Sequence, residues 1–132
     1  MNIIRFPYGK THIEYDFKNE NLIDIAKSKL NDYIPQSYGE EAVKKALMNP
    51  TDSEPLSFLA KGKKNIVIIA SDHTRPVPSK IIISPMLEEI RKGNPDADIT
   101  ILIATGCHRT TTIEELTAKF GEEIVRNEKI VI

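Results

Sequence analysis

Two short segments of the chain combine residue types that bind anions and transfer protons. The first is Ser71-Asp72-His73-Thr74-Arg75, and the second is Thr105-Gly106-Cys107-His108-Arg109. In both, hydroxyl and imidazole groups precede an arginine, and a guanidinium binds phosphate or carboxylate through two parallel hydrogen bonds. Imidazole is the side chain best suited to proton transfer near neutral pH. The two segments are therefore the candidate site.

Each segment follows a continuous run of apolar, largely β-branched residues. The runs are 66–70 and 99–104, and residues 79–92 between them carry apolar side chains at helical spacing. Continuous runs are typical of parallel strands covered on both faces, and strand, helix, strand predicts a right-handed βαβ unit. Because ligands bind at the carboxyl ends of such strands, both segments are expected at one edge of a sheet.

The rest of the chain predicts further elements around this unit. Residues 2–8 and 11–17 predict an N-terminal β-hairpin, and the alternation in 21–30 slightly favours a strand. The apolar run 129–132 predicts the start of another strand, and no turn or capping residue follows it. Helical spacing, caps and prolines predict three shorter helices, at 40–48, 54–60 and 112–120, the last with a Thr112/Glu115 capping box.

These elements define an α/β fold class: a βαβ-type parallel sheet with flanking helices and an N-terminal β-hairpin. We expect a single domain over residues 1–132, with the hairpin at 2–17 and Rossmann-like βα units at 64–132. The unfinished strand at its end indicates an incomplete N-terminal domain of a longer protein. The exposed edge of such a sheet also allows a homo-oligomer.

Composition argues against several classes of protein. The chain has 132 residues, 40% of them apolar and 28% charged, as in an ordinary globular domain. A formal charge of −1 without a basic cluster argues against nucleic-acid binding. No apolar run approaches the ~20 residues of a membrane span. Because the chain has one cysteine and no signal peptide, we expect a soluble, cytoplasmic protein.

The residues by themselves leave three functions open. His108 could be the acid–base group of an enzyme, or a hydrogen-bond donor in a non-catalytic nucleotide- or phosphate-binding module that uses Arg75 and Arg109. A hydrolase with Asp72 and His108 around a divalent metal is the third, although no tight ligand spacing appears and no metal ligand is assigned. Cys107 is expected to be a small buried residue, because no orienting group lies at recognisable spacing from it.

The two motifs, taken in their order, resemble the nickel-dependent lactate racemase family. Ser71-Asp72-His73-Thr74-Arg75-Pro76-Val77-Pro78 is followed by Ile103-Ala104-Thr105-Gly106-Cys107-His108-Arg109 and then by Glu114-Glu115. The similarity runs from the hairpin through Ala46-Leu47-Met48-Asn49-Pro50 to the end of the chain. It implies that the chain is the N-terminal part of a much longer two-domain α/β enzyme, which interconverts the stereoisomers of a 2-hydroxy acid.

The same resemblance implies a cofactor and residue roles. The cofactor is a nickel pincer nucleotide, the nickel complex of pyridinium-3,5-bisthiocarboxylic acid mononucleotide, which takes hydride from the substrate carbon and returns it. The loop implied to contact it consists of Asp72, His73, Thr74 and Arg75. His108 matches one of two histidines that shuttle the hydroxyl proton, and Arg109 beside it would help to hold the anionic ligand. The family's cofactor-tethering lysine, nickel-binding histidine and second acid–base histidine would follow residue 132. The chain alone is thus expected to hold no cofactor and to be inactive.

Overall fold

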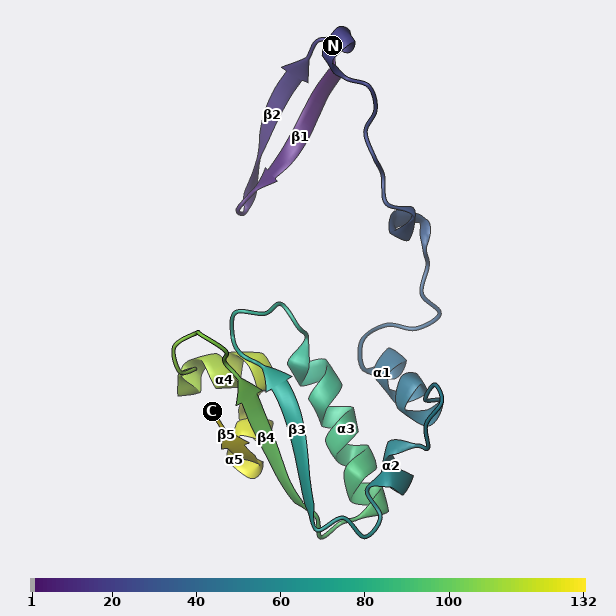
Figure 1. Cartoon of the computed structure of the whole chain (residues 1–132), viewed down its shortest axis with the longest axis vertical. Coiled ribbons are helices and arrows are strands. Elements are labelled where there is room, and N and C mark those ends of the chain that lie inside the picture. The colour runs from purple at the N-terminus through teal and green to yellow at the C-terminus, as the bar shows by residue number, and fades with distance from the viewer. Residues whose placement is uncertain (1) are drawn as a thin grey trace. The chain divides into compact units, whose positions relative to one another are not determined.

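The computed structural model describes residues 2–132, which form two compact units. The first unit ends at Pro35 and contains strands β1 (Asn2–Tyr8) and β2 (Thr11–Phe17), paired as an antiparallel hairpin. Gly9 turns the chain between them with a φ of +59°, a conformation that glycine adopts without steric cost. The predicted hairpin is therefore confirmed (Figure 1).

The strand predicted at 21–30 is wrong. This stretch is irregular and is flanked by short 3-10 turns at Asn19–Asn21 and Lys29–Asp32. Its apolar side chains are not buried, since Ile23 is 102% exposed and Leu30 is 73% exposed. Alternation stabilises a strand only when one face packs on something and the backbone pairs with a neighbour, and this segment has neither.

The second unit, from Gln36 to Ile132, carries both candidate segments. It contains a parallel sheet in the order β3-β4-β5, and the helices predicted at 40–48, 79–92 and 112–120 all form. The Thr112/Glu115 capping box is also present, and the predicted α/β class is confirmed. The elements are α1 (Gly39–Met48), α2 (Leu56–Leu59), β3 (Asn65–Ser71), α3 (Ser79–Gly93), β4 (Asp98–Ala104), α4 (Ile113–Phe120), α5 (Glu122–Asn127) and β5 (Lys129–Val131).

The hydrophobic core lies on one face of this sheet. Ile68 pairs with Ile101 in register, and Ile101 with Ile130, so these side chains point to the same side. Ile101, in the central strand, is 0% exposed. Helices α3, α4 and α5 cover this face with apolar side chains, namely Ile83, Leu87, Ile90, Leu116, Phe120 and Ile124.

The other face of the sheet is open. Val67, Ile69, Leu102 and Val131 are 57%, 71%, 37% and 41% exposed. Within the second unit taken by itself, the prediction of a sheet covered on both faces is therefore wrong. The strands lie in the sheet in the order β3-β4-β5, which is their order in the chain. Each connection between parallel strands is a right-handed crossover, and successive crossovers that move in the same direction across a sheet place their helices on the same face.

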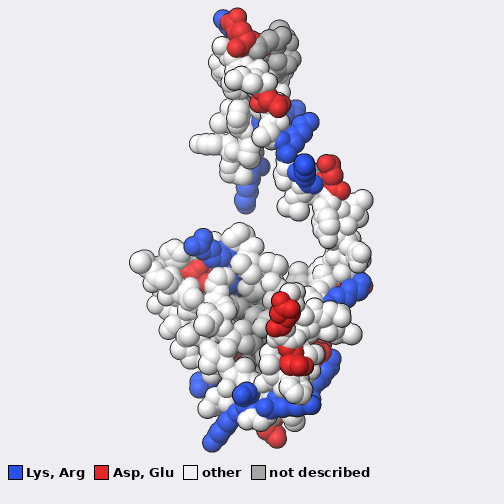
Figure 2. All heavy atoms as spheres, turned by 45° about the vertical axis from the view of Figure 1, so that its right-hand side comes forward, with Lys and Arg blue, Asp and Glu red and all other residues white. Residues whose placement is uncertain are grey.

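Charged side chains are unevenly spread over the second unit. Lys61, Lys63 and Lys64 are exposed in the turn before β3, where the strands begin. Figure 2 shows basic groups gathered at that end, with a broad uncharged surface between them and the charged groups at the opposite end of the unit. No helix within residues 2–132 is both long enough and apolar enough to cross a lipid bilayer.

The one-sided core gives a stability prediction. Ile101→Ala is expected to lower the free energy of unfolding of the 132-residue chain by about 2–5 kcal/mol, because it removes fully buried methyl groups. Leu102→Ala, the matched control on the open face, should cost far less, since its side chain is already partly in water. Urea unfolding of both variants measures the difference, and equal losses would contradict a one-sided core.

Candidate functional site

The two candidate segments begin side by side at the carboxyl ends of β3 and β4. Ser71 and Ala104, the last residues of these strands, are partners in the parallel register. Gly106, at a φ of +60°, turns the second loop, and the His108 amide closes that turn on the Thr105 carbonyl oxygen at 3.0 Å. We call the cavity of about 340 Å³ between the strand ends and these loops the strand-end cavity. Its polar lining includes Ser71, Asp72, Arg75, Cys107 and His108.

A carboxylate and an imidazole form a pair in this cavity. The Nδ1 atom of His108 lies 2.5 Å from Oδ2 of Asp72. Thr74 donates to the other carboxylate oxygen, Oδ1, from its hydroxyl at 2.7 Å and from its amide at 3.1 Å. Asp72 is 1% exposed, whereas the His108 side chain is 46% exposed. A carboxylate on Nδ1 selects the tautomer that carries its proton there, so Nε2 is left as the proton-accepting nitrogen.

Asp72 stays ionised in this environment. The hydrogen bond from the Thr74 hydroxyl lowers the pKa of Asp72 from 3.8 to about 2. Burial opposes that shift, while His108 and the Thr74 amide add to it. The carboxylate therefore keeps its charge at neutral pH, and a charged acceptor holds the imidazole more firmly than a neutral one.

The low pKa of Asp72 makes the free energy of unfolding depend on pH in the acidic range. A carboxyl group whose pKa is lower in the folded chain than in the unfolded chain stabilises the fold above its unfolded pKa. That stabilisation is lost as the pH falls from about 3.8 to about 2. Thr74→Val should raise the pKa of Asp72 toward its ordinary value, so this variant should lose less stability over that pH range than the parent chain.

The measurement for this prediction is urea unfolding at several pH values, together with a carbon NMR titration of the Asp72 carboxyl. Thr110→Val is the matched control, because Thr110 is exposed and its hydroxyl has no hydrogen bond in the described part of the chain. An unchanged Asp72 titration in Thr74→Val would contradict the assignment of the shift to that hydroxyl.

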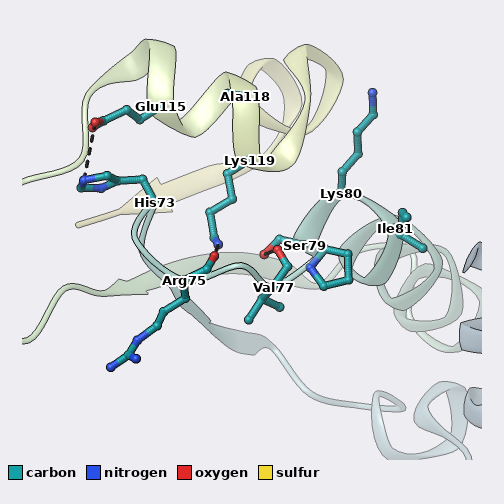
Figure 3. Close-up of a pocket in the computed structure, with 10 residues that line it drawn as sticks. His73, Arg75, Val77, Ser79, Lys80, Ile81, Glu115, Ala118 and Lys119 are labelled. Carbon is teal, nitrogen blue, oxygen red and sulfur yellow. Dashed lines mark hydrogen bonds and ion pairs between the residues drawn. The ribbon is translucent and has the colours of Figure 1, made fainter. Parts of the chain in front are cut away.

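His73 belongs to a second group of side chains. Its Nδ1 atom is 3.2 Å from the hydroxyl of Thr111, and its Nε2 atom is 3.5 Å from Oε1 of Glu115 (Figure 3). Arg109 donates two hydrogen bonds to the same carboxylate, at 2.5 and 2.9 Å. Arg109 thereby lowers the pKa of Glu115 to about 2, with help from the Thr112 amide. Glu115 thus ties the first loop, through His73, to the second loop, through Arg109.

Arg75 is the cation that neither group neutralises. Its guanidinium has no hydrogen bond or ion pair within residues 2–132, although Lys119 donates to its carbonyl oxygen at 3.0 Å. Figure 3 shows the Arg75 side chain pointing away from Glu115 and Lys119. Arg75 lines the strand-end cavity and also a neighbouring cavity of about 560 Å³, which His73, Lys80 and Glu115 line as well.

The structure therefore divides the residues that the sequence grouped together. Asp72 and Thr74 stand with His108, while His73 stands with Arg109, whose guanidinium is occupied by Glu115. Reasoning from the sequence did not select Glu115 as a site residue, and the capping box was the signal that could have found it. No three His, Cys, Asp or Glu side chains of the described residues are grouped so as to hold a metal ion.

The prediction that Cys107 is buried is wrong. Cys107 is exposed and lines the strand-end cavity. It follows Gly106 in the tight turn beyond the end of β4, where the chain has already left the sheet and its covering helices. A small apolar residue type therefore did not indicate burial at this position.

Fold and site together define an α/β domain that carries an imidazole–carboxylate pair and an unpaired arginine at the carboxyl edge of a parallel sheet. The family model of the lactate racemase N-terminal domain matches residues 8–132 of this chain. The chain belongs to this family.

Individual relatives agree with this assignment. The chain is 51% identical to a lactate racemase of Thermoanaerobacterium thermosaccharolyticum and 48% identical to one of Lactiplantibacillus plantarum, in each case over all 132 residues. It spans 31% of the length of each of these relatives. The solved structure of the lactate racemase apoprotein from Thermoanaerobacterium thermosaccharolyticum superposes with a TM-score of 0.88 at 50% identity, covering 98% of this chain and 30% of that one.

Proposed function

We propose that this chain is the N-terminal, cofactor-binding and acid–base-bearing part of a cytoplasmic lactate racemase-like enzyme. The observation that carries the proposal is the Asp72–His108 pair beside Arg75 at the strand-end cavity. The names of the relatives and the family support the same activity. Its substrate is a 2-hydroxy acid such as lactate, a small anion with one hydroxyl group next to its carboxylate.

His108 is one of two groups that move the hydroxyl proton in this proposal, and it is the one that this chain contains. When a 2-hydroxy acid loses hydride from its C2 carbon, the hydroxyl group becomes a ketone only if its proton also leaves. The exposed imidazole, held through Nδ1 by Asp72, accepts that proton at Nε2 and gives it back when hydride returns to either face. Asp72 acts through His108 as a positioning residue, and Arg75 supplies the positive charge for an anionic group.

The donors of the strand-end cavity fit an anionic cofactor. The Ser71 hydroxyl oxygen is buried and has no hydrogen-bond partner in the described chain, and the Arg75 guanidinium is unpaired. Because a buried polar group without a partner is costly, the Ser71 hydroxyl would gain from a phosphate or carboxylate oxygen, and the exposed Arg75 guanidinium would bind the same group through two parallel hydrogen bonds. We propose a nickel pincer nucleotide, which supplies the acceptor and donor of hydride when bound. The loop of Asp72, His73, Thr74 and Arg75 would border it, with Arg75 as the direct anion contact.

A stereochemical assay tests this function. The full-length protein supplied with the nickel cofactor should convert either enantiomer of lactate into a mixture of both, as measured by chiral chromatography. The 132-residue chain should convert neither, because the family's cofactor-tethering lysine and second acid–base histidine are not among its residues. Racemisation by the 132-residue chain would overturn the proposed division of the site, and no racemisation by the loaded full-length protein would overturn the activity.

A non-catalytic nucleotide- or phosphate-binding module is the second candidate, and the unpaired Arg75 and Ser71 favour it as well. In that case AMP or inorganic phosphate should bind the 132-residue chain itself. Arg75→Ala should then abolish binding in isothermal titration calorimetry, whereas His108→Ala should leave it unchanged. Such binding, together with a full-length protein that does not racemise lactate, would make the module the better description.

A further inference from the structure

Helix α4 holds both loops of the strand-end cavity. The carboxylate of Glu115, in its first turn, accepts two hydrogen bonds from Arg109 in the second loop, at 2.5 Å on Oε1 and 2.9 Å on Oε2. Oε1 also lies 3.5 Å from Nε2 of His73 in the first loop (Figure 3). In the last turn of the helix, Lys119 donates to the carbonyl oxygen of Arg75 at 3.0 Å. One short helix therefore contacts fixed points in both loops.

The two side chains that Glu115 binds are the chain neighbours of the imidazole–carboxylate pair. His73 follows Asp72, and Arg109 follows His108. The 2.5 Å contact between His108 Nδ1 and Asp72 Oδ2 therefore joins two loops that Glu115 also joins, one residue further along each. Loops lack the regular backbone hydrogen bonds of a strand or helix, so supporting side-chain contacts of this kind hold a functional pair in place.

Helix α4 is a rigid support for such contacts. Leu116 and Phe120 on its inner face are 3% and 1% exposed and belong to the hydrophobic core. The hydrogen bonds from Arg109 lower the pKa of Glu115 to about 2, so its carboxylate is charged at neutral pH. A charged pair with two parallel hydrogen bonds fixes orientation as well as distance. Glu115 is thus a charged anchor on an element that the core holds in place.

The partners of Glu115 are already engaged. Both terminal nitrogens of Arg109 donate to the Glu115 carboxylate. His73 has one ring nitrogen near Glu115 and the other 3.2 Å from the hydroxyl of Thr111, which is 3% exposed. An anion that bound the fork of Arg109 would first have to displace a carboxylate that already fills it. These contacts favour a supporting role for both side chains over direct binding of a ligand.

We propose that Glu115 is a positioning residue for the imidazole–carboxylate pair. Its contacts with His73 and Arg109 set how the two loops approach each other. They thereby set the separation and orientation of Asp72 and His108. Arg109 then acts on the reaction through Glu115 and does not hold the anionic group of the substrate. The effect on the geometry of the pair stands by itself, whereas the effect on turnover rests on the proposed function.

Glu115→Gln separates this role from the structural role of Glu115 in the capping box with Thr112. Glutamine also serves in a capping box, because its carbonyl oxygen accepts from the amide of the cap residue. It has one acceptor oxygen where the carboxylate has two, so the paired hydrogen bonds from Arg109 are lost. Glu114→Gln is the matched control. It removes the same charge from the same turn, and Glu114 is exposed with its hydrogen bonds inside that turn.

Hydrogen exchange of the His108 ring proton, measured by NMR, tests the geometry without activity. In the 132-residue chain, the Nδ1 proton should exchange with water at least about 10-fold faster in Glu115→Gln than in Glu114→Gln, because the pair separates more often. The Tm values of the two variants should agree within about 3 °C, since exposed ion pairs contribute little to stability. Equal exchange rates would overturn the proposal. A Tm that falls far more in Glu115→Gln would also overturn it, because the carboxylate would then have a structural role.

Kinetics of the full-length protein test the consequence for turnover. Glu115→Gln should lower kcat for lactate racemisation roughly 10- to 100-fold, because the reacting groups lose alignment, and should leave KM within about 2-fold. Arg109→Lys keeps the charge but loses the paired hydrogen bonds, so it should behave in the same way. The double variant should be no slower than the slower single variant, because both changes break one contact. Losses that multiply, or a raised KM with a normal kcat in Arg109→Lys, would assign Arg109 to the substrate anion and overturn the proposal.

The positioning role and the proposed function fail separately. A loaded wild-type protein that does not racemise lactate overturns the proposed function, and the exchange measurement still decides whether Glu115 positions the pair. An active wild-type protein whose Glu115→Gln variant keeps a normal kcat and normal exchange overturns only the positioning role.

Discussion

His108→Ala in the full-length protein is expected to lower the rate of lactate racemisation at least ~100-fold, because it removes the proposed acid–base group for the hydroxyl proton. The loss should appear in kcat for both enantiomers, since the two directions of a racemisation pass through the same proton-transfer steps. Chiral chromatography of timed samples measures it. Cofactor content, read from the nickel-to-protein ratio, should be unchanged, because His108 is not among the proposed cofactor-binding residues.

His12→Ala is the control for this experiment. His12 lies on strand β2 of the hairpin and is exposed, and its imidazole Nε2 lies 3.5 Å from Oε1 of Glu14. Its replacement should leave the racemisation rate unchanged. A loss in His108→Ala no larger than in this control would count against a catalytic role for His108.

Asp72→Asn is expected to cost on the order of 100-fold in kcat in the full-length protein, although the side chain keeps its size. An amide can donate to the imidazole as well as accept from it, so it no longer selects the tautomer with the proton on Nδ1. In catalytic triads the equivalent change acts through the wrong tautomer. Because the Asp72 carboxylate is buried and accepts from both His108 and Thr74, no other described side chain can take over its role.

A tautomer measurement separates this positioning role from a purely structural one. Nitrogen NMR of the 132-residue chain should show neutral His108 with its proton on Nδ1, and Asp72→Asn should shift the population toward the other tautomer. Asp96→Asn is the control, because Asp96 is exposed in the turn between α3 and β4. If Asp72→Asn lowers kcat but leaves the tautomer population of His108 unchanged, the loss comes from a structural defect and not from the orientation of the imidazole.

Local patterns predicted most of the elements that carry this site. The runs 66–70 and 99–104, the apolar spacing of 79–92 and the cap at Thr112 each depend on neighbours within a few residues, and all of these elements formed. Alternation in 21–30 failed because a strand also needs a partner, which the local sequence does not specify.

The sequence by itself determined that two polar loops follow neighbouring parallel strands, and therefore that they meet at one edge of a sheet. Only the tertiary structure decided how their side chains pair. It joins Asp72 to His108 and directs His73 to Glu115, although Asp72 and His73 are adjacent in the chain. Loop backbones have no fixed period, so the direction of each side chain depends on the turns and on the helix packed beside them. The exposure of Cys107, which lies in one of these loops, was likewise visible only in the structure. The open face of the sheet was also decided by the tertiary structure, because covering a face depends on the direction in which distant segments cross it.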